Sequence, residues 1–260
     1  MSQVSVPAPV TAYRPGVRSL VTLIGCEVKM VLRDTAGLVV PLGLPLLILL
    51  TSAGSAGGQV VANGRTALEV FVLPLVLAMV VAMIGIINMP SFLAYYRRSG
   101  ILRRLAVTPA SPGMVLAAQV IASVLQALVG IALATGVAFL VFGVGAPADI
   151  GVTLGVFVLV MAAMYAAGMI VAAVAPTPNS AVAIGLVFFF LVGALGGMFG
   201  GPDALPAPLA TIGGWLPFGA AVAAISAAWS GTAVGAAQLV GLGTTVVVGV
   251  LVAGLLFRWE

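Results

Sequence analysis

The sequence predicts an all-α integral membrane protein with six transmembrane helices and both termini on the cytoplasmic side. Of its 260 residues, 62% are hydrophobic and only 6% are charged, and the mean hydropathy is +1.29. Soluble domains carry about a quarter charged residues, so this chain cannot cover a water-facing surface. Two further observations support the prediction: the apolar runs have the length of membrane spans, and the basic residues gather on one side of the resulting topology.

The six expected spans follow from the lengths of the uncharged runs. A helix needs about 20 mostly apolar residues to cross a bilayer. Loop-like segments such as "TSAGSAGGQVVANG", "AVTPASPG", "GVGAPAD" and "APTPNS" divide the runs, because Gly, Pro, Asn and Ser favour turns. The spans are expected at about residues 36–54, 68–91, 114–142, 151–174, 181–200 and 233–257.

The distribution of basic residues supports an even number of spans. With both termini inside, the external segments hold a single basic residue, Arg65, whereas cytoplasmic loops in general are enriched in Lys and Arg. The cytoplasmic segments hold the other nine, which are Arg14, Arg18, Lys29, Arg33, Arg97, Arg98, Arg103, Arg104 and Arg258.

Residues 205–229 leave an alternative open. The stretch "LPAPLATIGGWLPFGAAVAAISAAW" is apolar enough to be a seventh span. Its three prolines and the Gly213-Gly214 pair instead favour short re-entrant or interfacial helices on the external side, between the fifth and sixth spans.

Residues 17–34, before the first span, are expected to form an amphipathic helix in the inner interface. Its basic residues share one face within about 60°, and apolar residues fill the opposite arc. Such a helix lies with its basic face toward lipid phosphates. Glu27 interrupts the apolar arc, and it has two interpretations: a pair with a neighbouring arginine, or a contact to another subunit. The charged residues of the segment are Arg18, Glu27, Lys29, Arg33 and Asp34.

Few polar residues lie inside the expected spans, and four of them are candidates for function. They are Asn88 in the second span and Gln119, Ser123 and Gln126, which share one face of the third. They can form interhelical hydrogen bonds, worth ~0.6–2 kcal/mol each in membranes. The alternative is that they line a substrate path.

The chemical composition excludes several functions. The chain has no histidine, its one cysteine is Cys26, and no acidic residue lies in the middle of an expected span. Such groups are needed by a metal-dependent hydrolase, by a hydrolase whose nucleophile is activated by a base, and by a proton-coupled carrier. The only lysine, Lys29, is not in a Gly-Lys-Ser/Thr sequence, so the chain has no ATP-binding P-loop. We therefore expect no catalytic site, metal or cofactor in this chain, and no nucleic-acid partner.

The segment "YYRRSGILRRLAVTPASP", residues 95–112, has four arginines within eight positions. The arginines could serve only to keep this loop on the cytoplasmic side, which would explain its charge. Apolar residues alternate with the arginines, however, which predicts a short amphipathic helix that ends before Thr108-Pro109. Such a rigid cytoplasmic helix between two spans is suited to receive force from a cytosolic partner.

Three segments in this order resemble the permease subunits of type-2 ATP-binding-cassette exporters, a group with antibiotic-resistance, polysaccharide and lipid export permeases. They are "KMVLRDTAGLVVPLGLPLLILL", "SGILRRLAVTPASPGMVLAAQV" and "VAPTPNSAVAIGLVFFFLVGALGGMFGGPDALPAPLATIGGWLPFG". The resemblance covers about residues 20–257. Family members often have a Glu shortly before the loop glycine and a Thr after it, whereas this chain has Arg97-Arg98-Ser99 and Ile101.

The resemblance implies a multi-pass subunit of the bacterial cytoplasmic membrane that exports a hydrophobic or amphipathic drug, antibiotic or lipid. It implies two partners: a second permease copy or a homologue, and a cytosolic ATPase that holds ATP and magnesium. The ATPase would dock on the interfacial helix and on the coupling loop, through Arg97, Arg98, Gly100, Leu102, Arg103, Arg104, Leu105, Thr108 and Pro109. The alternatives are a secondary carrier or channel not powered by ATP, and a membrane scaffold.

Overall fold

The computed structural model describes residues 16–58, 60–62, 64–100, 112–201 and 204–256. Within them, six helices are long and apolar enough to cross a membrane, which confirms the predicted all-α membrane architecture with six spans. The helices that form the spans are α2 (Thr35–Ala56), α3 (Leu73–Ala82) continued by α4 (Met89–Arg98), α6 (Pro112–Phe142), α7 (Ile150–Val174), α8 (Pro178–Leu195) and α11 (Ala236–Leu256).

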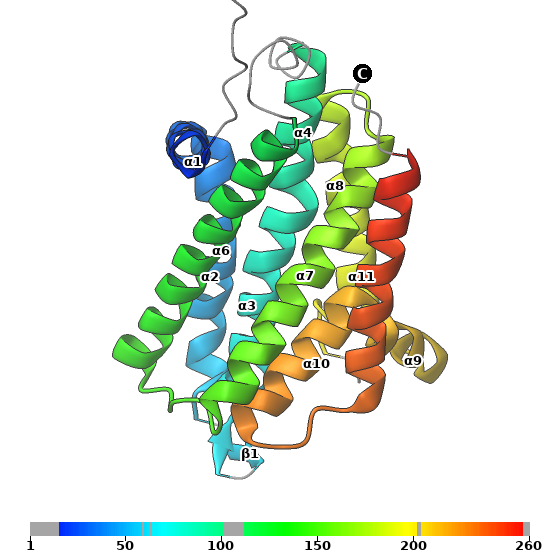
Figure 1. The fold of residues 1–260 in the computed structure, drawn as a ribbon. Helices are drawn as coiled ribbons and strands as arrows, with labels where there is room; N and C mark the ends of the chain where they lie inside the picture. Colours follow the sequence, from blue (N-terminus) through cyan, green and yellow to red (C-terminus); the bar gives the residue numbers. More distant parts are fainter. Residues whose placement is uncertain (1–15, 59, 63, 101–111, 202–203, 257–260) are drawn as a thin grey trace, which may run out of the picture.

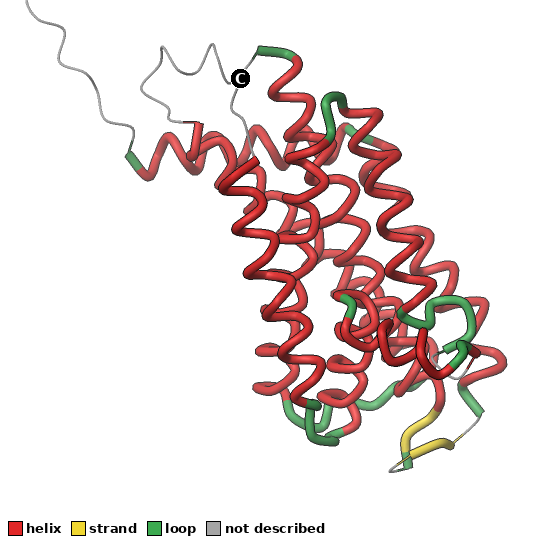
Figure 2. The backbone as a smooth tube through the Cα atoms, turned by 90° about the vertical axis from the view of Figure 1, so that its right-hand side faces the viewer, coloured by secondary structure: helices red, strands yellow, loops and turns green. Residues whose placement is uncertain are grey.

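The spans form one bundle with two different ends. At one end, the amphipathic helix α1 (Val17–Arg33) lies across the bundle, and α4 and α11 end there too (Figures 1 and 2). At the other end, β1 (Val60–Ala62) pairs antiparallel with β2 (Arg65–Thr66). We call these the α1 end and the hairpin end.

The observed spans differ from the expected ones mainly in the second and fifth. The second span runs from Leu68 to Arg98 as one continuous helical segment, so Arg97 and Arg98 are its last turn rather than part of a loop. Proline is tolerated in the first turn of a helix, and Pro90 therefore begins α4 without ending the span. The fifth span begins at Pro178, behind a Thr177 capping box, and ends at Leu195 before a glycine-rich turn.

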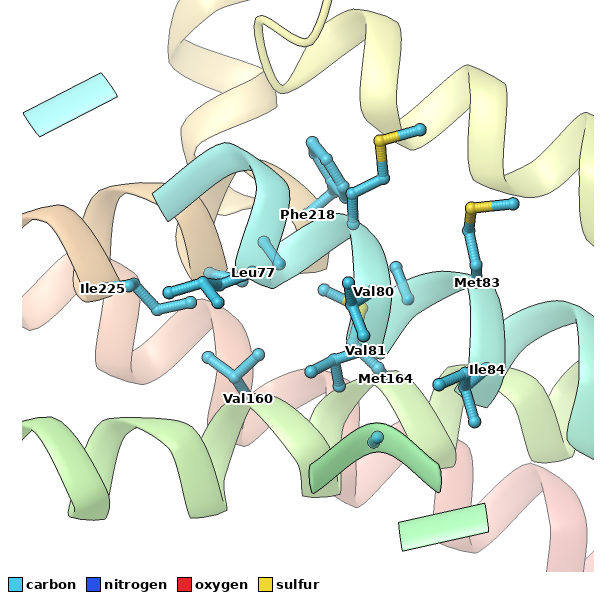
Figure 3. Packing of buried hydrophobic residues seen from close by; sticks show 14 of the residues in the cluster. Leu77, Val80, Val81, Met83, Ile84, Val160, Met164, Phe218 and Ile225 are labelled. Atoms are coloured by element: carbon cyan, nitrogen blue, oxygen red, sulfur yellow. The ribbon is translucent and has the colours of Figure 1, made fainter. Parts of the chain in front are cut away.

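The second span is the centre of the bundle. In its most apolar stretch 83% of the residues are buried inside the protein, against 22% for the first and sixth spans. Figure 3 shows Val80 and Ile84 of this span packed near Val160 and Met164 of α7, with Phe218 and Ile225 of α10 (Pro217–Ser230) beside Leu77. The outer spans are left to face lipid.

Residues 207–230 form two short helices joined by a sharp bend. Helix α9 (Ala207–Trp215) and α10 meet at an angle of 81° at Leu216. Each is shorter than the ~20 residues that a membrane crossing needs. Both lie in the half of the bundle toward the hairpin end (Figure 1), as expected for a re-entrant pair.

Candidate functional site

The junction between α1 and α2 is built around Asp34. Asp34 ends α1 and caps the N-terminus of α2, where its Oδ1 accepts a hydrogen bond from the Gly37 backbone N–H at 3.1 Å. Aspartate is among the preferred residues at this position. A Cβ on Gly37 would overlap the Asp34 carboxylate, so this close cap requires glycine. The sequence "RDTAG" thereby turns the chain from the interface into the membrane.

The Gly37 carbonyl accepts hydrogen bonds from two other spans. Asn88, the last residue of the π-helical segment η2 (Met83–Asn88), donates one through Nδ2, and Gln126 of α6 donates the second through Nε2 at 2.7 Å. Both side chains are buried. The first span is therefore hydrogen-bonded to the second and the third spans through a single atom, the carbonyl oxygen of Gly37.

An open groove lies beside Asn88, between α2 and α8, and we call it the α2–α8 groove. It consists of two adjoining hollows of about 400 and 380 Å³, both lined by Asp34 and Ser91. The hollow deeper in the bundle is otherwise lined by Ala36, Gly37, Val40, Pro41, Met83, Ile87, Asn88, Val182 and Leu186. The hollow toward the α1 end is otherwise lined by Met30, Arg33, Phe92, Tyr95 and Pro178.

Of the four polar candidates inside the spans, only Asn88 lines this groove. Ser123 is buried and donates back to the Gln119 carbonyl of its own helix at 2.8 Å. Gln119 is fully buried, and neither of its amide atoms has a hydrogen-bond partner among the described residues. The polar face of the third span thus points into the bundle, and only its Gln126 forms an interhelical hydrogen bond among these residues.

Glu27 has a different partner from either of the two expected. It is buried, and its carboxylate accepts a hydrogen bond from the Tyr96 hydroxyl at the end of α4 in the same chain. Burial raises the pKa of Glu27, and the hydrogen bond from Tyr96 opposes that rise. The apolar arc of α1 packs on α6 and α4, so an acceptor for the buried tyrosine belongs on this arc rather than on the basic face. Arg18, Lys29 and Arg33 are exposed on the opposite side.

Arg97 reaches sideways to the fourth span. Its Nη2 donates to the carbonyls of Ala172 and Ala175, the latter at 2.8 Å, at the C-terminus of α7. A cation is favourable at a helix C-terminus, where carbonyls lack partners. Arg97 thus lies in the last turn of α4 and bonds to α7, whereas its neighbour Arg98 is exposed, and the ATPase contact expected of Arg97 stays a prediction.

The rest of the expected coupling loop is only partly described. Gly100 has a φ of +67° and follows the α4 C-cap, a left-handed position that favours glycine. Leu102, Arg103, Arg104, Leu105, Thr108 and Pro109 lie outside the described residues.

A second polar cluster, not singled out from the sequence, lies at the hairpin end. Glu69 is buried and accepts hydrogen bonds from the backbone N–H groups of Thr66 and Gly145, at 2.9 and 2.7 Å. It also pairs with Arg65 at 3.3 Å, and the Trp229 indole N–H donates to the Gly145 carbonyl at 3.2 Å. The i, i+4 spacing of Arg65 and Glu69 was the signal in the sequence.

The arrangement contains no recognisable catalytic centre within the described residues. No group of three His, Cys, Asp or Glu side chains there could hold a metal ion. In the comparison with known families, the family described as ABC-2 type transporter matches residues 18–230. No curated protein sequence matches the chain.

Proposed function

Because this chain belongs to the ABC-2 type transporter family, a family of multi-pass membrane proteins that work with an ABC ATPase, we propose that it exports a hydrophobic or amphipathic substrate. The cargo is a drug, an antibiotic or a lipid, and a separate ATPase subunit supplies the energy. The observation that carries this proposal is the α2–α8 groove. It is an open, substrate-sized hollow, and the described spans carry no acidic residue away from their ends that could couple transport to a proton gradient.

The groove matches an amphipathic molecule along its length. Arg33, Asp34 and Tyr95 line it at the level of α1, where an amphipathic helix lies in the lipid interface. Val40, Met83 and Leu186 line it deeper in the bundle. A molecule with a polar head and an apolar body can place each part against groups of its own kind, with Asn88 between them as a hydrogen-bonding group.

The α1 end is the cytoplasmic side in this proposal. Of the ten basic residues, nine belong to segments assigned to that side by the positive-inside rule. The chain works in the bacterial cytoplasmic membrane together with a second copy or a homologue. Arg103 and Arg104 of the coupling loop and the exposed basic face of α1 contact the ATPase, which binds ATP and magnesium.

The first experiment tests the ATPase partner. The tagged chain is purified from its native membrane in mild detergent, and copurifying proteins are identified by mass spectrometry. We expect a P-loop ATPase in roughly equal amount, lost when Arg103 and Arg104 are both changed to Glu and retained with Arg258→Glu, which alters charge elsewhere on the same side. A chain that emerges alone and still moves substrate in liposomes without ATP would be a carrier instead.

The second experiment tests the groove. Leu186→Trp fills the deeper hollow, whereas Val187→Trp places the same ring one residue further along α8, where the side chain is exposed. In proteoliposomes with the ATPase, we expect Leu186→Trp to abolish substrate-stimulated ATP hydrolysis and Val187→Trp to preserve it. Equal activity of the two variants would remove the groove from the transport route.

A further inference from the structure

The second span contains two π-helical segments, at its start and near its middle. In η1 (Leu68–Val72) and η2, the closing N–H groups of Leu73 and Met89 bond to the carbonyls of Leu68 and Ile84, five residues earlier. Such wide turns are rare and occur frequently at functional sites. Two π-helical segments in one span therefore call for an explanation in the sequence.

A proline follows each π segment. Pro74 and Pro90 lie in the first turns of α3 and α4. A proline has no N–H to donate, and its ring crowds the carbonyl four residues earlier, which here belongs to Val70 or Ile86. The helix widens to a π turn just before each proline. The carbonyl four residues before the proline loses its usual N–H donor, so it needs another partner.

The two freed carbonyls are treated differently. The Val70 carbonyl accepts a hydrogen bond from Ser226 Oγ of α10 at 2.6 Å, next to the Glu69 cluster. Among the described residues, no side chain donates to the Ile86 carbonyl. The Gly185 backbone of α8 lies against it instead, so that a Cβ on Gly185 would be 2.7 Å from that oxygen. The carbonyl freed in the first π segment is therefore hydrogen-bonded to a neighbouring helix, whereas the carbonyl freed in the second makes only van der Waals contact with α8.

Glycines bound η2 on two sides. Besides Gly185, Gly168 of α7 lies so close to the Gly85 carbonyl that a Cβ there would overlap it. At these two points backbone packs directly on backbone, so a small rotation of η2 there displaces no side chain.

A rotation at η2 would affect both the α2–α8 groove and the cytoplasmic end of the second span. Met83, Ile87 and Asn88 of η2 line the α2–α8 groove. Beyond η2, α4 leads to Tyr96 and Arg97, which bond to α1 and α7, and then to the coupling loop. The segment lies between the groove and the end of the span that faces the ATPase in the proposed function.

We propose that η2 is the hinge of the second span. Helix α4 swings on it against Gly168 and Gly185, while η1 and α3 stay fixed at the hairpin end. The swing moves Asn88 relative to the Gly37 carbonyl and changes the width of the groove. This inference rests on the proposed function, because the ATPase supplies the force on α4.

The test compares two equivalent proline substitutions. Pro90→Ala restores an N–H that can bond to Ile86 and stiffens η2, whereas Pro74→Ala makes the same change where Ser226 already holds the carbonyl. Nitroxide labels at Ser99→Cys and Leu255→Cys, in a Cys26→Ser background, report the distance between the ends of α4 and α11 in the complex with the ATPase. We expect Pro90→Ala to lose the nucleotide-dependent distance change and to lower transport per ATP by about fivefold or more. Pro74→Ala should keep both.

The outcomes separate the hinge from the proposed function. The hinge is overturned if wild type transports with ATP and Pro90→Ala keeps the same distance change and transport. If Pro90→Ala does not insert into the membrane, Gly185→Ala, which crowds the Ile86 carbonyl, is tested in its place. We expect it to lose the nucleotide-dependent distance change and transport, and unchanged values of both would overturn the hinge. Wild type that recruits no ATPase and shows no ATP-driven transport overturns the proposed function, and the hinge loses its driving force with it.

Discussion

At the scale of single residues, two neighbours at the end of α4 reach in different directions. Tyr96 donates to Glu27 of α1, and Arg97 donates to the last carbonyls of α7. Both contacts join elements that are distant in sequence. Any displacement of α4 is therefore passed to the interfacial helix and to the fourth span.

Substitution of Arg97 tests this contact. Arg97→Met leaves two α7 carbonyls without a charged donor, and hydrogen bonds to charged groups contribute about 1.5–3 kcal/mol. We expect a lower thermal unfolding temperature in detergent, partial recovery with Arg97→Lys, and little change with the exposed neighbour Arg98→Met. Equal destabilisation by the two methionine variants would contradict the capping role.

Glu27 predicts a pH dependence for the docking of α1. Burial raises its pKa above the ordinary value of 4.5, so the docked state holds the proton more tightly than the undocked one. Docking is strongest below that ordinary value and weakens as the pH rises through the raised one. A spin label on Cys26, the sole and exposed cysteine, should become more mobile across this interval. The mobility should not vary with pH in Glu27→Gln, and a pH response that persists there would assign the effect to another group.

At the scale of elements, α7 and α11 pack extensively against each other. The sixth span has small residues every fourth position, and Gly249 among them lies against the Ala166 backbone, where a Cβ would overlap the carbonyl. Small residues let membrane helices approach closely. The spacing in the sequence predicts such a face, but only the structure identifies α7 as its partner.

Gly249→Leu should separate these two spans. Overpacking of a tight contact costs about 1–3 kcal/mol, which should appear as a lower unfolding temperature and a weaker yield of folded protein. Val247→Leu adds bulk on an exposed face of the same helix and should be neutral. If both variants unfold at the wild-type temperature, α11 does not depend on this contact.

At the scale of the whole molecule, the two ends of the bundle are held in different ways. The hairpin end is joined by the Glu69 cluster, which links the hairpin, the segment after α6 and the re-entrant helix α10. The α1 end is joined by side chains on a helix that continues into the coupling loop. In the proposed function, the hairpin end holds its shape and the α1 end transmits movement.

Trp229→Phe tests the cohesion of the hairpin end. The substitution removes the indole donor to the Gly145 carbonyl while it keeps an aromatic ring, and the loss of a typical hydrogen bond costs about 0.5–1.5 kcal/mol. We expect lower thermal stability, and an effect not additive with that of Glu69→Gln, because both act on the segment at Gly145. Trp215→Phe, at a half-exposed indole, serves as the control. Additive effects would show that Glu69 and Trp229 act independently.

The sequence by itself determined the membrane class, the six spans and the amphipathic first helix, and it indicated short helices within residues 205–229. These features depend on local composition and periodicity, because the bilayer imposes length and polarity on each helix separately. The family resemblance could also be recognised from short segments, since their order and spacing are properties of the chain alone.

Only the tertiary structure decided what each polar side chain does. Glu27 bonds to Tyr96, Arg97 bonds to the C-terminal carbonyls of α7, and Gln119 lies inside the bundle rather than beside the groove. Each of these outcomes depends on which helix packs alongside and at what height. That is set by contacts between residues about 70 or more positions apart, which periodicity within one helix does not record.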